Sequence, residues 1–231
     1  MSNLATIAQA IAVVSACWAI ISGVGAWKRE FIGKRKIELA EETLATFFEV
    51  KDAIAYIRNP WSSGTEGSTR KTATGESDAE SNLLDRGHIV FDRYESKKEI
   101  FVRFRTQKYR FMAVFGNETD ATFDSVNEIL NQIFSSASML ATHYWRRQGR
   151  VEMEEDEFTK HLDEMHKHEG IFWDRYSADD EVRGKLSTIQ AMLEDVTRPC
   201  FEEPMKTYSL LTRSWFRRNS KKVATKKTPN L

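Results

Sequence analysis

The residues with the clearest potential for chemistry are His161, Glu164 and His168. In a helix, their spacing of i, i+3 and i+7 would place the three side chains on one face. Two imidazoles and a carboxylate are ligands that proteins offer to zinc or iron. The sequence therefore predicts a candidate metal site here. A solvated helix face of mixed charge explains the same residues, and we prefer that interpretation.

Other patterns that carry catalysis are missing from the sequence. It contains no H-E-x-x-H, no nucleophile elbow, no Walker loop and no paired Glu-x-x-His of the di-iron bundles. Cys200 follows Pro199 and has no histidine partner that the sequence identifies. The sequence thus favours a protein that is not an enzyme and that needs no cofactor.

The amino-terminal segment has the composition of a membrane helix. No side chain from Ser2 to Trp27 is charged, and a helix needs about 20 apolar residues to cross a bilayer. Basic residues follow at once: Lys28, Arg29, Lys34, Arg35 and Lys36. Because basic residues mark the cytoplasmic side, we expect residues 1–27 to form an anchor, with residues 4–27 in the lipid bilayer and the N-terminus outside. A cleaved signal peptide and a soluble apolar helix are the alternatives, although the basic residues lie on the wrong side for a signal peptide.

Small residues recur at every fourth position of this segment, at Ala8, Ala12 and Ala16. Such spacing lets two membrane helices approach closely. Self-association into a homo-oligomer is therefore expected, and an alanine-rich helix without a partner is the equal alternative.

The remainder of the chain shows helical periodicity and no strand pattern. With 41% hydrophobic and 29% charged residues, it excludes both wholesale disorder and a multi-span membrane protein. We expect a basic juxtamembrane segment and first bundle helix over 28–58, a flexible loop over 59–82, further bundle helices over 83–203 and a basic tail over 204–231. The predicted fold is all-α, with the amino-terminal transmembrane helix continuing into a cytoplasmic antiparallel bundle of about four to five helices.

Particular residues mark the expected helix ends. Asn59-Pro60 should end the first bundle helix, and Gly116 the second. Ser177, with Asp180 three residues on, resembles a capping box that would open the last helix, which should stop before Pro199. Basic residues of the second bundle helix should pair with the two acidic helices that end the bundle.

Charge is segregated along a chain whose 34 basic and 34 acidic residues balance. Residues 204–231 contain no acid, so both ends of the chain are basic and the body between them is acidic. Such a tail can contact anionic lipid, which we expect of its basic residues Arg213, Arg217, Arg218, Lys221 and Lys222. A solvated tail and a nucleic-acid-binding tail are the alternatives.

Two stretches carry a likeness to known sequences: ELAEETLATFFEVKDAIAYIRNPWSSGTEGSTR from Glu38 to Arg70, and the region from Trp173 through Asp180-Glu181 to Arg198-Pro199. They resemble a group of uncharacterised bacterial proteins with one amino-terminal membrane helix. The resemblance implies a bacterial inner-membrane location and brings no activity with it.

These observations combine into one functional prediction. The chain should be a non-enzymatic single-pass membrane protein whose cytoplasmic bundle acts as a scaffold or sensor for a protein partner. The alternatives are a membrane-tethered metalloenzyme that uses the His161, Glu164 and His168 face, and nucleic-acid binding by the basic tail.

Overall fold

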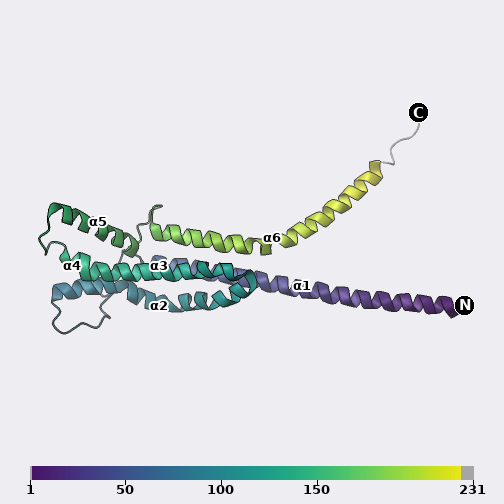
Figure 1. The fold of residues 1–231 in the computed structure, drawn as a ribbon, viewed down its shortest axis with the longest axis horizontal. Coiled ribbons are helices and arrows are strands. Elements are labelled where there is room, and N and C mark those ends of the chain that lie inside the picture. Colours follow the sequence, from purple (N-terminus) through teal and green to yellow (C-terminus); the bar gives the residue numbers. More distant parts are fainter. Residues whose placement is uncertain (1, 225–231) are drawn as a thin grey trace, which may run out of the picture. The chain divides into compact units, whose positions relative to one another are not determined.

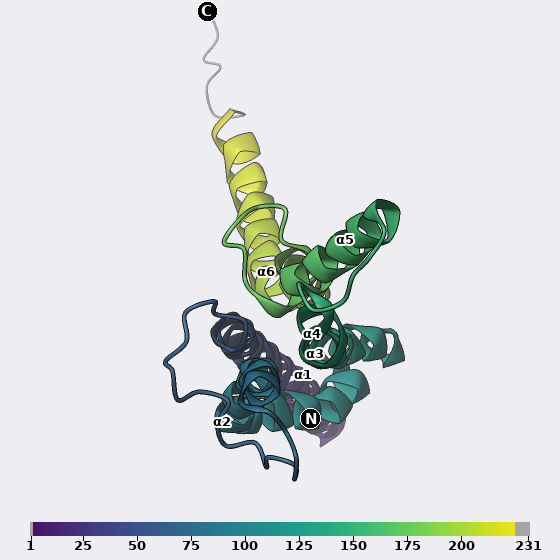
Figure 2. The same ribbon diagram turned by 90° about the vertical axis from the view of Figure 1, so that its left-hand side faces the viewer.

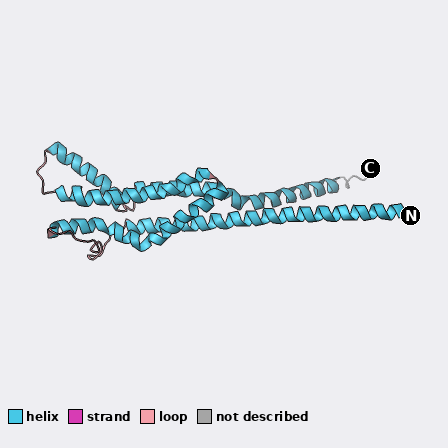
Figure 3. Cartoon of the chain, turned by 60° about the horizontal axis from the view of Figure 1, so that its bottom comes forward, coloured by secondary structure: helices cyan, strands magenta, loops and turns pink. Residues whose placement is uncertain are grey.

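The computed structural model describes the backbone of residues 2–224, and the side chains between residues 7 and 202 apart from those of residues 8, 26 and 29. Within this range all regular structure is helical, so the all-α prediction is confirmed (Figure 1, Figure 3). The helices are α1 (Ser2–Ile57), α2 (Asp78–Phe115), α3 (Asp120–Met139), α4 (Trp145–Arg147), α5 (Glu155–Phe172) and α6 (Glu181–Ala224). Two shorter segments are the 3₁₀-helix η1 (Asn117–Thr119) and the π-helix η2 (Leu140–Tyr144).

Residues 42–196 form one compact unit, which we call the bundle. Within it, α1 runs antiparallel to both α2 and α6. Going forward along α1, Thr46 contacts Gln107 of α2 and Glu49 contacts Arg103. The α1–α6 pair runs the same way, because Lys51 contacts Gln190 and Arg58 contacts Asp180.

Aromatic side chains join the first three helices of the bundle. Phe104 of α2 packs against Phe47 of α1 at 5.8 Å and against Phe123 of α3 at 4.7 Å between ring centroids. All three side chains are almost fully buried. Full burial of one such side chain contributes about 1.5–3 kcal/mol, so this row is a main source of bundle stability. These phenylalanines recur at helical spacing in the sequence, and that spacing located the core correctly.

The loop between α1 and α2 is shorter than predicted. It ends at Ser77, whose hydroxyl accepts a hydrogen bond from Glu80 N–H and so starts α2 at Asp78. Inside the loop, Arg70 pairs with Glu76 and with Asp85 of α2. The polar composition from which we expected a flexible loop thus includes charged groups that pair with one another and with α2.

The connection between α2 and α3 follows the sequence prediction. Gly116 adopts φ +106° and its N–H bonds to the Met112 carbonyl, which ends α2. The predicted charge pairing is wrong for the basic residues nearby. Lys108 pairs with Asp120 and Asp124 of α3, and Arg103 pairs with α1, because antiparallel neighbours in sequence order lie closest to α2.

The start and the extent of α6 both differ from the prediction. Asp180, and not Ser177, is the N-cap, because its carboxylate accepts the N–H of Arg183. The helix continues past Pro199 to Ala224. A proline removes one backbone donor and strains one turn, and here the helical conformation persists beyond it.

Residues 1–41 and 197–231 form a second unit. In α1, large apolar side chains of this unit are exposed, including Trp18 at 72% and Ile21 at 71%. Among the described residues, α1 is the one helix that is long and apolar enough to cross a membrane. Its apolar window is not buried by any other part of the described chain.

Candidate functional site

The three predicted metal ligands lie on α5 in different environments. His161 is buried, at 6% exposure, whereas Glu164 is exposed and pairs with Lys167. His168 is half-buried, and its Nδ1 lies 3.0 Å from the Ser136 hydroxyl of α3. In the described part of the chain no group of three or more His, Cys, Asp or Glu side chains could hold a metal ion. The structure therefore does not bring the predicted set together, because one ligand faces solvent while the two imidazoles face the bundle.

The two imidazoles lie instead against one tyrosine ring. Tyr144 of η2 lies 5.4 Å from His161 and 5.1 Å from His168 between ring centroids. The Nε2 atom of His161 is buried and has no hydrogen-bond partner within the described residues. Burial also lowers the pKa of His168, against the raising effect of Glu164. This arrangement packs α5 beside η2, the segment between α3 and α4, and Figure 2 shows α5 next to these two helices. Burial favours a neutral imidazole at His168.

The most elaborate polar cluster of the bundle lies where α1 ends. Arg58 is 1% exposed, and its guanidinium forms a bidentate ion pair with Asp180, with N–O distances of 2.9 and 2.7 Å. The same guanidinium donates to the backbone carbonyls of Gly170 and Ile171 in the last turn of α5, and of Trp173 directly after it. One buried side chain, at the residue that directly follows α1, therefore holds the α5–α6 connection in place.

The carboxylate of Asp180 accepts hydrogen bonds from the Arg58 side chain and also from the backbone. Besides Arg58, it accepts the backbone N–H groups of Arg175 and Arg183. Burial acts to raise the pKa of Asp180, but these four donors outweigh it and the net pKa is lowered. The carboxylate is thus held ionised inside the bundle, opposite the guanidinium.

A second ion pair lies next to the first. Asp174 is buried, and it pairs with Arg183 of α6 at 2.9 Å. The same carboxylate accepts the backbone N–H of Tyr176, which adopts φ +54°, a left-handed conformation that is costly for a residue with a side chain. The loop between α5 and α6 is therefore fixed by charge as well as by its backbone.

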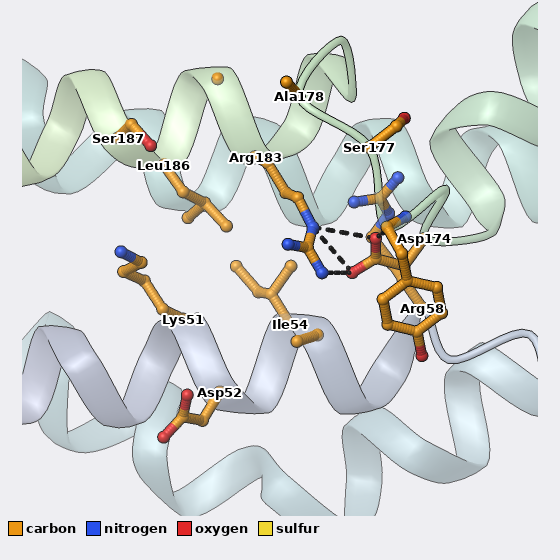
Figure 4. Close-up of a pocket in the computed structure, with 13 residues that line it drawn as sticks. Lys51, Asp52, Ile54, Arg58, Asp174, Ser177, Ala178, Arg183, Leu186 and Ser187 are labelled. Carbon is orange, nitrogen blue, oxygen red and sulfur yellow. Dashed lines mark hydrogen bonds and ion pairs between the residues drawn. The ribbon is translucent and has the colours of Figure 1, made fainter.

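A cavity of about 560 Å³ opens beside these pairs (Figure 4). Its walls come from α1, from the start of α6 and from the loop between α5 and α6. Lys51 and Ile54 line it from α1, and Gly184 and Ser187 line it from α6. The volume lies within the range of about 300–1,000 Å³ that is usual for small-molecule sites. This cavity is the candidate functional site of the bundle.

Arg93 of α2 forms a separate buried centre at the end of α1. It is 3% exposed and donates to the backbone carbonyls of Ile57 and Trp61, and it pairs with Glu66 of the following loop. The last carbonyls of a helix lack partners within the helix, so this guanidinium satisfies part of the α1 terminus. We regard it as structural.

Sequence reasoning missed Arg58, Asp180 and Arg93 as buried groups. A signal was present, since Arg58 lies four residues after the buried Ile54 and shares its face of α1. A charged residue on the apolar face of a helix is a reason to expect a buried partner.

The predicted lipid-contacting residues, Arg213, Arg217, Arg218, Lys221 and Lys222, have side chains outside the described residues.

Comparisons with protein-family models, with curated proteins and with solved structures found no match for this chain.

Proposed function

We propose that this protein is a single-pass protein of the bacterial inner membrane whose cytoplasmic helical bundle acts as a sensor or scaffold for a protein partner. The observation that carries the proposal is the apolar part of α1, which no other described segment covers. Each large apolar side chain moved out of water contributes about 1.5–3 kcal/mol. A row of them, from Ile7 to Trp27, would be strongly unfavourable in water and favourable in lipid.

The orientation follows from the residues at the end of the apolar stretch. Trp27 stacks on Phe31 at 5.8 Å between ring centroids, and aromatic rings of this kind favour the membrane interface. Basic residues follow from Lys28 onward, which favours a cytoplasmic position for the bundle and an outer position for the N-terminus.

A sensing or scaffolding role is supported by the continuity of α1. The helix runs without a break from the apolar segment to Ile57, so its last turns belong to the bundle core. A membrane segment and a packed domain that share one helix can affect each other without a flexible linker between them. Self-association through Ala8, Ala12 and Ala16 is part of the same proposal.

Membrane fractionation tests the location. Full-length protein should stay in the membrane pellet after carbonate extraction, and deletion of residues 1–27 should release it. A matched variant with Ile20→Lys and Ile21→Lys should also be released, because two charges at the centre of the span oppose insertion. Full-length protein recovered in the soluble fraction would refute the proposal.

Reporter fusions test the orientation. A reporter that is active only in the cytoplasm should work when fused after residue 202, and one that is active only outside the cell should not. The opposite pattern would contradict the proposed topology while leaving the membrane anchor intact.

A further inference from the structure

The cavity between α1 and α6 contains a cation without a matching anion. The Nζ of half-buried Lys51 donates to the neutral Gln190 amide oxygen at 2.6 Å. Within the part of the chain that the structure describes, no carboxylate forms an ion pair with Lys51. Its sequence neighbour Asp52 also lines the cavity, but the Asp52 carboxylate is turned away from α6, whereas Lys51 extends from α1 toward α6 (Figure 4).

Two guanidinium groups of the cavity wall are already neutralised, because Arg58 pairs with Asp180 and Arg183 pairs with Asp174. Lys51 and Asp52 are the charged lining residues that form no ion pair with the described chain. Of these two, Lys51 extends toward α6, so its ammonium group is the charge that a ligand between α1 and α6 would meet. A partly desolvated ammonium group attracts an anion more strongly than an exposed one does, because water screens it less.

The remaining walls suit a small organic molecule. Ser187 of α6 supplies a hydroxyl, and the side chains of Ile54 and Leu186 supply apolar surface. A Cβ atom built on Gly184 would meet nothing within 4 Å, so this glycine leaves part of the cavity open. Few convergent polar groups on an apolar wall are typical of small-molecule sites.

We propose that this cavity binds a small organic anion whose carboxylate or phosphate group accepts hydrogen bonds from Lys51 and Ser187. The apolar part of the ligand lies against Ile54 and Leu186. Because α1, α6 and the loop between α5 and α6 all line the cavity, the bound anion stabilises the contact between α1 and α6. This inference rests on the proposed sensor function in one respect: the anion would be the signal that the bundle senses.

The test uses the full chain in detergent, with sodium phosphate and sodium succinate as probes against sodium chloride of equal ionic strength. A ligand that binds only the folded state raises the unfolding temperature in a saturable way. At least one probe should do so at millimolar concentration. A response to phosphate alone identifies a phosphate ligand, and a response to succinate alone identifies a carboxylate ligand.

Variants locate the binding. Lys51→Met should weaken it at least tenfold, and the exposed Lys71→Gln should leave it unchanged. Gly184→Leu should also weaken it at least tenfold by narrowing the cavity, whereas Gly184→Ala controls for helix propensity and should retain binding. If Lys51→Met fails to fold, the Gly184 pair decides alone.

Two results would overturn the inference: no saturable shift with either probe, or equal shifts in the parent chain and in both Lys51→Met and Gly184→Leu. Neither result bears on membrane fractionation, so the anion site can fail while the membrane proposal stands. Conversely, a full-length protein recovered as soluble would refute the location and would leave the binding measurement valid.

Discussion

Removing the carboxylate of Asp180 should destabilise the bundle more than any surface change. In Asp180→Ala, the guanidinium of Arg58 stays 1% exposed but loses both of its ionic hydrogen bonds. Breaking a buried ion pair by removing one partner costs about 3–5 kcal/mol, because a charge is left buried without compensation. The backbone N–H groups of Arg175 and Arg183 lose their acceptor as well. We therefore expect a loss at the upper end of that range.

Urea unfolding of the full chain in detergent measures this loss. With a slope of about 2 kcal/mol per molar urea, a loss of about 5 kcal/mol lowers the midpoint by about 2.5 M. The matched control is Asp179→Asn, one residue earlier and exposed, whose carboxylate is hydrogen-bonded to Ser177 and whose loss should lower the midpoint far less. The pH dependence has a defined sign. Since the folded pKa of Asp180 is lowered, its contribution is present above its unfolded pKa and is lost as pH falls through the folded value.

A double-mutant cycle separates the pair from its surroundings. Arg58→Met removes the charge but also leaves three carbonyls without their donor, so it should destabilise on its own. Arg58→Met combined with Asp180→Ala should cost clearly less than the sum of the two single changes. Two outcomes would show that the ion pair does not hold the α5–α6 connection. One is that the losses of the two single changes add in the double variant, and the other is that the urea midpoint of Asp180→Ala lies within about 0.3 M of the parent midpoint.

Two further predictions concern α5 and α2. Burial lowers the pKa of His168, so the stability that its neutral form contributes is full above about pH 6.5 and declines as pH falls below that value. His168→Gln should therefore flatten the pH dependence of the unfolding temperature between about pH 5 and 7. An unchanged profile would contradict the burial argument. At Gly87, a Cβ would lie 2.6 Å from Ala141 Cβ and 3.1 Å from the Ala137 carbonyl oxygen. Gly87→Ala should therefore lower the free energy of unfolding in urea by about 1–3 kcal/mol, despite the better helix propensity of alanine. Gly184→Ala, where a Cβ would meet nothing within 4 Å, should instead raise it by up to about 1 kcal/mol. A stabilised Gly87→Ala variant would show that α2 and η2 do not approach that closely.

The sequence predicted the apolar elements well, because their periodicity reports burial directly. Phe123, Val126 and Ile133 recur at helical spacing and are all buried in α3. The end of α1 was also predictable, since proline disfavours helical geometry in the residue before it, here Asn59.

The polar centres were not predictable in the same way. A buried ion pair such as Arg58 with Asp180 joins residues that are far apart in the chain, so local spacing can indicate that Arg58 is buried but cannot identify its partner. The π-helix at η2 was missed for a related reason. Its widened turn positions Tyr144 against two histidines of another helix, and such a contact is decided by tertiary packing.

The predicted metal face illustrates the limit of spacing arguments. His161 and His168 do share a side of α5, as their separation implies, and both contact Tyr144. What spacing could not show is which partner faces them across the interface. In the structure that partner is an aromatic ring, and the intervening Glu164 forms its own pair with Lys167.

The antiparallel contact between α1 and α6 has a mechanical consequence. Within the bundle, residue 42 of α1 and residue 196 of α6 lie at the same end of this helix pair, and the Arg58–Asp180 pair lies at the opposite end. A load that draws those two backbones apart separates the helices progressively from that end, and it reaches the Lys51–Gln190 bond before the Arg58–Asp180 pair. The Arg58–Asp180 ion pair breaks last, because it lies about 24 Å along the helix axis from residue 42, where the load is applied. Partial separation near the point of loading is therefore reversible, because the far end still holds the two helices in register.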